Sequence, residues 1–377
     1  MVETVTQKED WEHYPWEKLD GKNLLDALER FSVEKGISDI HISPEKAFVR
    51  LEIRLHGVLL PLAKLEERSY IDLVRRVKFR SKLKLNVTNI PQDGQYTFEA
   101  PGRTVNVRVA CIPSRFGETY TLRLLDPNKG LVPLETLGFP KAIHEKLAEL
   151  VKLPNGLILV TGPTGSGKTT TLYSLLITIV GKERNIITLE DPIEYELPGI
   201  VQSQVDPDHD YDFARGLRSI LRHDPNVVLV GEIRDMETAQ TAIDASLTGH
   251  LVLSTLHTNN AIEAIPRFLS MGVSPYTFAP SLRAILAQRL VRTLTDECKA
   301  DGAQCDPADH NTYNGVKAVP ELLIATKEIR ELILMNEPAS AIEKVAKEQG
   351  FMDMRDWGKI FVQNKITNMS EVMRVTM

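Results

Sequence analysis

Cysteine is scarce in this sequence, and long apolar runs and long basic runs are missing. Only three cysteines, Cys111, Cys298 and Cys305, occur among 377 residues, which excludes a disulfide framework and is typical of a reducing compartment. The sequence contains no run of 18 apolar residues, the length that would predict a membrane span. The first residues are acidic and polar, unlike a secretory signal. The sequence therefore predicts a cytoplasmic protein.

The charge balance is slightly acidic. Lys and Arg total 45 against 51 Asp and Glu, for a net charge of -6, so nucleic acid is not expected as a partner. The chain is 42% hydrophobic, and its 22 Gly and 21 Pro do not cluster, which predicts a chain folded nearly throughout. Its length is sufficient for two domains, each with its own core.

Hydrophobic periodicity divides the chain into three parts. Residues 1–22 are expected to form an N-terminal extension. Residues 23–130 begin with an amphipathic helix at 23–35 and continue with alternating segments such as "VRLEIRLHGVLL" and "TVNVRVACIP", which predict a small α/β domain with a polar sheet face. The segment "DPNKGLVPLETLGFP" at 126–140 lacks a clear period and is the expected linker.

Residues 131–377 have the pattern of a second α/β domain. Apolar runs such as "GLILVTG", "NIITLED", "NVVLVGE" and "HLVLSTL" alternate with helical segments. That alternation predicts a parallel sheet with crossover helices. After about residue 278 only helical segments are expected.

The stretch "GPTGSGKTTTLYS" has the sequence and setting of a phosphate-binding loop. Gly162, Gly167, Lys168 and Thr169 satisfy G-x-x-x-x-G-K-[ST] between an apolar strand and a helix. Backbone N–H groups would hold the β-phosphate, Lys168 would reach the β/γ oxygens, and Thr169 would ligate Mg²⁺. A ligand-free glycine turn rarely has this full context. The predicted nucleotide-binding residues are Gly162, Pro163, Thr164, Gly165, Ser166, Gly167, Lys168, Thr169 and Thr170.

Acidic residues follow two of the other predicted strands. Glu232 ends "NVVLVGE", where an acidic residue commonly orients Mg²⁺ or the attacking water; an exposed acidic turn is an equally common reading. Glu190, Asp191 and Glu194 follow "NIITLE", so these carboxylates should converge where ligands of open α/β sheets bind. Glu190 and Asp191 are candidate Mg²⁺ ligands, and a solvated acidic loop is the alternative.

Histidine and arginine residues complete the candidate site. His257 follows "TGHLVLSTL" at the same expected edge, although a lone histidine is more often structural. Arg218 and Arg222 are spaced i,i+4 on a predicted helix. Surface ion pairs are the more common role for such arginines.

Together these segments resemble one family, the ATPases that power type II secretion and type IV pilus assembly and retraction. The resemblance runs from about residue 23 and is carried by "SDIHISP", "PQDG", the phosphate loop, "LEDPIEY", "ILRHDPNVVLVGEIRD", "TGHLVLSTLHT" and "AQRLVR". It implies a small PAS-like α/β domain, a RecA-like P-loop ATPase domain with a helical C-terminal part, and ATP and Mg²⁺ as cofactors. It also implies a homo-hexamer that drives an inner-membrane platform protein from the inner face of the cytoplasmic membrane.

The resemblance also implies roles for individual residues. Glu194 is the expected general base, Glu232 is the glutamate of the second acidic motif, and His257 lies near the γ-phosphate. Arg108 and Arg123 match small-domain positions that close over the nucleotide. Arg218 and Arg222 match arginines of the same network.

Two departures from the family pattern bear on metal and direction. Assembly and secretion members usually hold zinc with two C-x-x-C pairs, but Thr295 replaces the first cysteine and only Cys298 and Cys305 remain. No zinc is expected, because structural zinc needs four good ligands. The residues of the nucleotide motifs and of the C-terminal segment resemble those of assembly motors, whereas the compact length resembles that of a retraction motor or of a compact assembly motor.

Three other readings remain open. A ring DNA translocase would share the sheet and the phosphate loop but should carry basic pore loops. A small-molecule phosphotransferase should transfer phosphate to an acceptor other than water. A nucleotide-gated scaffold would not need Lys168, Glu194 and Glu232 together.

Overall fold

The protein is described by a computed structural model that covers residues 14–181, 183–300 and 305–376. The chain divides into a small unit, residues 1–129, and a large unit, residues 130–377. Of the N-terminal extension expected at 1–22, residues 1–13 lie outside the described ranges.

The small unit consists of an antiparallel sheet and the helices packed on it. Its sheet has the order β3-β2-β1-β6-β5-β4. Its elements are α1 (Gly21–Lys35), β1 (Asp39–Pro44), β2 (Val49–Leu55), β3 (Val58–Leu65), α2 (Glu67–Arg80), β4 (Gln92–Ala100), β5 (Arg103–Ser114), β6 (Gly117–Leu125) and α3 (Pro127–Gly130), which ends at the first residue of the large unit.

Period-two alternation separates the two faces of the small sheet. Apolar side chains such as Ile40, Leu51 and Val107 are buried in one core with α1 and α2, because successive strand residues point to opposite faces. The Asp20 side chain accepts the N–H of Asn23 and caps α1, as expected for aspartate at a helix start. The small α/β domain with a polar sheet face is therefore confirmed.

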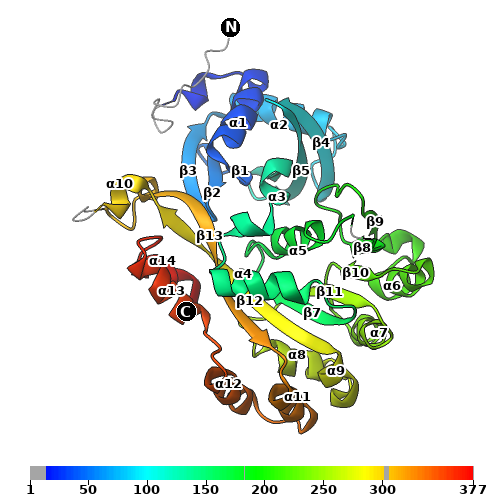
Figure 1. The fold of residues 1–377 in the computed structure, drawn as a ribbon. Helices are drawn as coiled ribbons and strands as arrows, with labels where there is room; N and C mark the ends of the chain where they lie inside the picture. The colour runs from blue at the N-terminus through cyan, green and yellow to red at the C-terminus, as the bar shows by residue number, and fades with distance from the viewer. Residues whose placement is uncertain (1–13, 182, 301–304, 377) are drawn as a thin grey trace. The chain divides into compact units, whose positions relative to one another are not determined.

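The large unit contains a mostly parallel sheet with helices on both faces (Figure 1). The sheet order is β13-β12-β7-β11-β10-β8-β9. The elements are α4 (Lys141–Leu150), β7 (Gly156–Thr161), α5 (Lys168–Ile177), β8 (Ile186–Glu190), β9 (Val201–Gln204), α6 (Phe213–Ile220), β10 (Val227–Val230), α7 (Met236–Leu247), β11 (Leu251–Leu256), α8 (Ala264–Ser270), α9 (Pro275–Ser281), β12 (Leu282–Leu294), α10 (Asp296–Lys299), β13 (Tyr313–Ile324), α11 (Lys327–Leu334), α12 (Ala339–Glu348), α13 (Met354–Gln363) and α14 (Met369–Thr376).

Both faces of this sheet are buried. On β7, Leu157 and Leu159 belong to one hydrophobic core, whereas Ile158 and Val160 belong to the other. Continuous apolar strands are the signature of such a two-sided sheet. The predicted α/β class with a parallel sheet is confirmed, and the carboxyl ends of β7, β11, β10 and β8 meet at one edge.

The expectation that only helices follow residue 278 is wrong for residues 282–324. β12 pairs in parallel with β7, and β13 pairs antiparallel with β12. Most of β12 is buried from both sides, so its apolar residues show no clear alternation and the run can be read as a helix. The helical C-terminal region begins only at α11.

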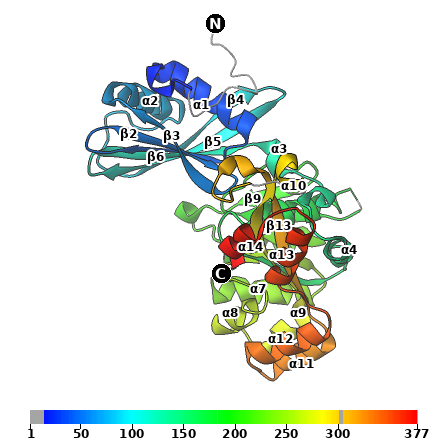
Figure 2. The same ribbon diagram turned by 90° about the vertical axis from the view of Figure 1, so that its left-hand side faces the viewer.

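The C-terminal helices form two pairs. α11 packs with α12 (Figure 2), whereas α13 packs on β13 and α14 packs on β12 (Figure 1). Glu371 fixes α14: its carboxylate accepts hydrogen bonds from Arg292, at 2.6 Å, and from Arg374. Burial alone would raise the pKa of Glu371, but these arginine hydrogen bonds outweigh burial and hold it at about 2.

Glu371→Gln is expected to destabilise the protein by about 3 kcal/mol, because the substitution leaves the buried Arg292 without its counter-ion. Because the folded pKa is depressed, the stabilisation by Glu371 is fully present above about pH 4.5, and it is lost as the pH falls towards 2. Urea unfolding at pH 7 and pH 3.5 measures both effects. A variant as stable as wild type at pH 7, or an equal gap at both pH values, would contradict the assignment.

Cys298 and Cys305 form a disulfide with a Cα–Cα distance of 5.8 Å, while Cys111 is buried and free. The sequence analysis did not predict this pair. Within the described residues, which omit 301–304, no group of three or more His, Cys, Asp or Glu side chains is arranged to hold a metal ion. The lack of zinc stays a prediction. None of the described helices is both long and apolar enough to cross a membrane.

Candidate active site

The predicted phosphate-binding loop lies between β7 and α5, as its motif requires. Gly162 has φ 147°, and a Cβ there would lie 2.5 Å from Ser166 Oγ and 2.6 Å from the Gln288 carbonyl oxygen. Gly167 has φ 85° and directly precedes α5. These glycines let the backbone turn tightly in front of a helix N-terminus, an arrangement that binds phosphate.

Lys168 lies at the first position of α5, and its ammonium donates to the carbonyl oxygens of Gly162 and Pro163 at 2.8 and 3.0 Å. Burial lowers the pKa of Lys168 to about 8, although the negative charge of Glu232 opposes this shift. The lysine is therefore still mostly protonated at pH 7. A cation held at the mouth of the loop is suited to bind phosphate oxygens.

Glu232 and His257 meet beside the loop, at the ends of the neighbouring strands β10 and β11. His257 Nε2 lies 3.8 Å from Glu232 Oε2, and Arg234 forms an ion pair with the same carboxylate. Burial and the charge of Lys168 lower the pKa of His257, so the imidazole is neutral at pH 7. The structure thus brings together Lys168, Glu232 and His257, and it adds Arg234, which the sequence analysis missed.

Glu190 is held in a buried network at the end of β8. Its carboxylate accepts hydrogen bonds from Tyr173, Thr188 and Gln202. These bonds satisfy the carboxylate without a metal and favour a structural role for Glu190. Its assignment as a Mg²⁺ ligand stays a prediction, as does that of the exposed Asp191.

The loop that carries Glu194 is anchored to α5. The Tyr173 ring of α5 packs edge-to-face on the Tyr195 ring, with the ring centroids 6.4 Å apart, and burial and Glu190 raise the pKa of the Tyr173 hydroxyl. The Tyr195 ring also packs on Gly130, where a Cβ would come within 1.9 Å of a ring carbon. Glu194 itself is only half-buried. Its loop is thus fixed relative to the helix that begins with Lys168.

Arg218 and Arg222 are separated by the end of a helix. Arg218 lies in α6 and donates to Glu237 at 2.5 Å, whereas Arg222 lies in the following 3₁₀ turn and donates to the Arg218 carbonyl oxygen and to Ser219 Oγ. These are surface contacts. The proposed place of both arginines in the catalytic network stays a prediction.

Arg108 and Arg123 lie opposite each other on neighbouring strands of the small unit. The row continues in register from Arg108 through Arg123 and Asp39 to Arg54. Asp39 is buried, and its carboxylate lies 2.8 Å from Arg123 Nε and 3.5 Å from Arg54 Nε. Three arginines against one aspartate leave this row with a net positive charge on the polar face.

Gln288 contacts the phosphate-binding loop, and the sequence analysis did not single it out. Its side chain is buried, donates to the Ser166 carbonyl oxygen at 2.7 Å, and accepts the Thr171 hydroxyl at 2.9 Å. It thus holds the phosphate loop against the start of α5. The segment "AQRLVR" contains this glutamine, but its chemistry appears only when β12 lies next to β7.

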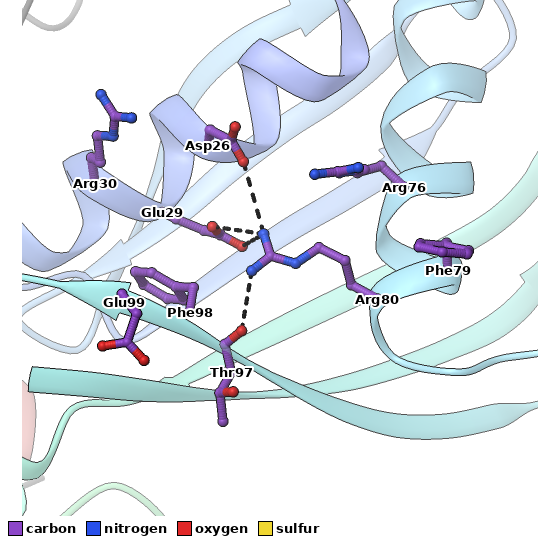
Figure 3. Close-up of a pocket in the computed structure, with 9 residues that line it drawn as sticks. All are labelled: Asp26, Glu29, Arg30, Arg76, Phe79, Arg80, Thr97, Phe98 and Glu99. Atoms are coloured by element: carbon purple, nitrogen blue, oxygen red, sulfur yellow. Dashed lines mark hydrogen bonds and ion pairs between the residues drawn. The ribbon is translucent and has the colours of Figure 1, made fainter.

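A pocket of about 450 Å³ lies in the small unit between α1, α2 and β4 (Figure 3). Arg80 extends across it, forms ion pairs with Glu29 and Asp26, and donates to the Thr97 carbonyl oxygen. Its guanidinium also stacks on Tyr96. These contacts already neutralise the central cation, and no glycine is among the residues that line the pocket, so it lacks the phosphate-binding features of the loop between β7 and α5.

Comparison with known proteins identifies the family to which the chain belongs. The family model described as "Type II/IV secretion system protein" matches residues 17–374. The type II secretion system ATPase E of Vibrio cholerae is 44% identical over 94% of this chain and 75% of its own length. The type II secretion system protein HxcR of Pseudomonas aeruginosa is 40% identical over 94% of this chain and 76% of its own length.

Solved structures share the fold. The pilus retraction motor PilT with bound ADP is 30% identical, has a TM-score of 0.65, and covers 92% of this chain and 95% of its own. The ATPase DotB of Legionella pneumophila has a TM-score of 0.73 at 24% identity and matches 95% of this chain and 96% of its own, which indicates the fold alone. The chain belongs to the type II/IV secretion system protein family and is a nucleotide-using secretion motor ATPase.

Proposed function

We propose that the protein is a hexameric motor that hydrolyses ATP with Mg²⁺ to drive an inner-membrane platform protein, and that it powers assembly of a type IV pilus or of a type II secretion pseudopilus. The observation that best supports this proposal is the cluster of Lys168, Glu232 and His257 beside a complete phosphate-binding loop. The relatives at 40–44% identity are named for type II secretion, while the retraction motor is 30% identical. This difference favours assembly over retraction.

The residues fit a nucleotide with its metal. Backbone N–H groups at the start of α5 would hold the β-phosphate, Lys168 would neutralise the β/γ oxygens, and Thr169 with Asp191 would hold Mg²⁺. Glu232 would orient the attacking water. Glu194 would accept a proton from that water, and His257 would contact the γ-phosphate.

Glu194→Gln is expected to retain ATP binding and to lose most turnover, because an amide keeps the shape of the side chain but cannot accept the proton. Phosphate release and binding of a fluorescent nucleotide measure the two properties separately. The matched variant Glu196→Gln changes an exposed glutamate of the same loop and should retain activity. Wild-type turnover by Glu194→Gln would remove Glu194 from the base role.

Deletion of the gene in the native organism tests the direction of the motor. Loss of surface filaments, or failed export with normal pili, is the expected result. An excess of filaments that are not retracted would overturn the assembly role and assign retraction. A complementing copy with Lys168→Ala should not restore the wild-type phenotype if the phenotype depends on ATP hydrolysis.

A further inference from the structure

Glu321 is a buried carboxylate of β13 that lies outside the catalytic cluster. It is 3% exposed, and its two oxygens accept from different parts of the chain. Oε1 accepts the N–H of Ala261 at 2.5 Å, and Oε2 accepts the N–H of Met354 at 3.2 Å. Ala261 belongs to the loop that follows β11, whereas Met354 begins α13. One side chain therefore joins the loop after β11 to a C-terminal helix.

Residues 257–261, here called the histidine loop, have a second anchor next to the phosphate loop. The N–H of Thr258 donates to Thr161 Oγ1 at 2.9 Å. Thr161 and Glu321 lie in one row across the sheet, because Ala287 pairs with both of them. The histidine loop is thus fixed at two points on the same sheet edge, and His257 stands next to the first of them.

Arg289 forms a second connection between the histidine loop and a C-terminal helix. Its guanidinium lies 3.4 Å from Asn259 Oδ1 in the histidine loop and donates to the Val375 carbonyl oxygen of α14 at 3.1 Å. Figure 1 shows α13 and α14 beside β12 and β13. The loop that carries His257 therefore contacts both C-terminal helices through side chains of these two strands.

The number of hydrogen bonds that Glu321 can accept depends on its charge state. Burial raises its pKa to about 7, the two backbone N–H groups and Arg289 lower it, and Asp353 raises it. Above about pH 7 the carboxylate is mostly ionised and acceptor-only, so it can satisfy both N–H groups. An amide offers one oxygen and directs its NH₂ group at the other N–H. Glutamine at this position would therefore lose one of the two anchors.

We propose that Glu321 is a positioning residue for ATP hydrolysis, which fixes the histidine loop to the N-terminus of α13 so that His257 faces Glu232 and Lys168. This inference rests on the proposed role of His257. A displacement of a catalytic group by about 1 Å costs on the order of 100-fold in rate. Glu321 would act through geometry alone, without contact with the nucleotide.

Glu321→Gln is expected to lower kcat by about 10- to 100-fold and to leave the KM for ATP within a few-fold, because the phosphate loop itself is unchanged. The matched control is Glu29→Gln, which removes a buried carboxylate of the small unit and should keep kcat near wild type. Thermal melting of both variants confirms that they are folded. Glu321→Asp, which keeps the carboxylate, should regain part of the lost kcat.

A double-mutant cycle with His257→Ala tests whether the effect passes through His257. Residues that act as one unit are not additive, so the double variant should hydrolyse ATP no more slowly than His257→Ala alone. Multiplied losses, a raised KM with unchanged kcat, or wild-type turnover by Glu321→Gln would each overturn the positioning role. Wild-type turnover by His257→Ala would instead refute the role of His257, on which the inference depends.

Discussion

Lys168→Ala is expected to abolish ATP turnover. Lys168 lies at the start of α5, next to Glu232, and burial places its pKa at about 8, so it supplies a positive charge at neutral pH where the β/γ-phosphates would bind. Alanine removes that charge and leaves the backbone of the loop in place. Steady-state phosphate release measures the loss, which should reach the background of the assay.

Lys141→Ala is the control for this substitution. Lys141 lies at the start of α4, is almost fully exposed, and has only a surface contact with Glu145, so its loss should leave turnover unchanged. Residual turnover above a few per cent in Lys168→Ala would mean that the loop does not bind the reacting phosphates in the proposed way.

Arg108→Ala and Arg123→Ala are each expected to lower kcat by about 1,000-fold or more, with nucleotide affinity changed only a few-fold. A guanidinium that reaches the transferring phosphoryl group stabilises charge in the transition state by this order of magnitude. Both arginines belong to the small unit, so they would reach the nucleotide only when that domain closes over a site. Single-turnover hydrolysis and equilibrium nucleotide binding separate these effects.

Arg50→Ala is the matched control for the arginine row. Arg50 lies on β2, two residues before Glu52 and on the same polar face as Arg54, and it forms surface ion pairs with Glu45 and Glu52. Its removal should not change turnover. Wild-type kcat in both Arg108→Ala and Arg123→Ala would contradict the proposed role of these arginines in hydrolysis.

Mixing variants shows which subunit supplies the arginine. If it comes from a neighbour, Arg123→Ala mixed with Lys168→Ala should regain activity, since some interfaces would combine an intact loop with an intact arginine. A loss that is not rescued, despite verified subunit exchange, would confine the arginine to the site of its own subunit.

The sequence correctly predicted features whose residues lie close together in the chain. The phosphate loop has its residues within one strand, turn and helix, so Gly162, Gly167 and Lys168 could be placed before the fold was known. Glu232 and His257 follow strands that pair in parallel, so their convergence also follows from strand order. Alternation in "TVNVRVACIP" likewise predicted which face of the small sheet carries Arg108, opposite Val105, Val107 and Val109.

Contacts between distant segments could not be predicted in this way. β12 and β13 were missed because burial on both faces removes the alternation that identifies a strand. Gln288 and Glu321 lie on these strands, so their contacts with Ser166 and Ala261 could not be inferred either. The buried hydrogen bonds of Glu190 depend on Tyr173, which precedes it by 17 residues on another element.

The packing of Gly130 on Tyr195 also has a mechanical meaning. Gly130 is the first residue of the large unit, and Tyr195 directly follows Glu194 in the chain. The small unit is thus joined covalently, through Lys129, to a residue that contacts the aromatic ring beside the proposed base. If Glu194 is the base, a conformational change at this junction would reach its loop through the contact between Gly130 and Tyr195.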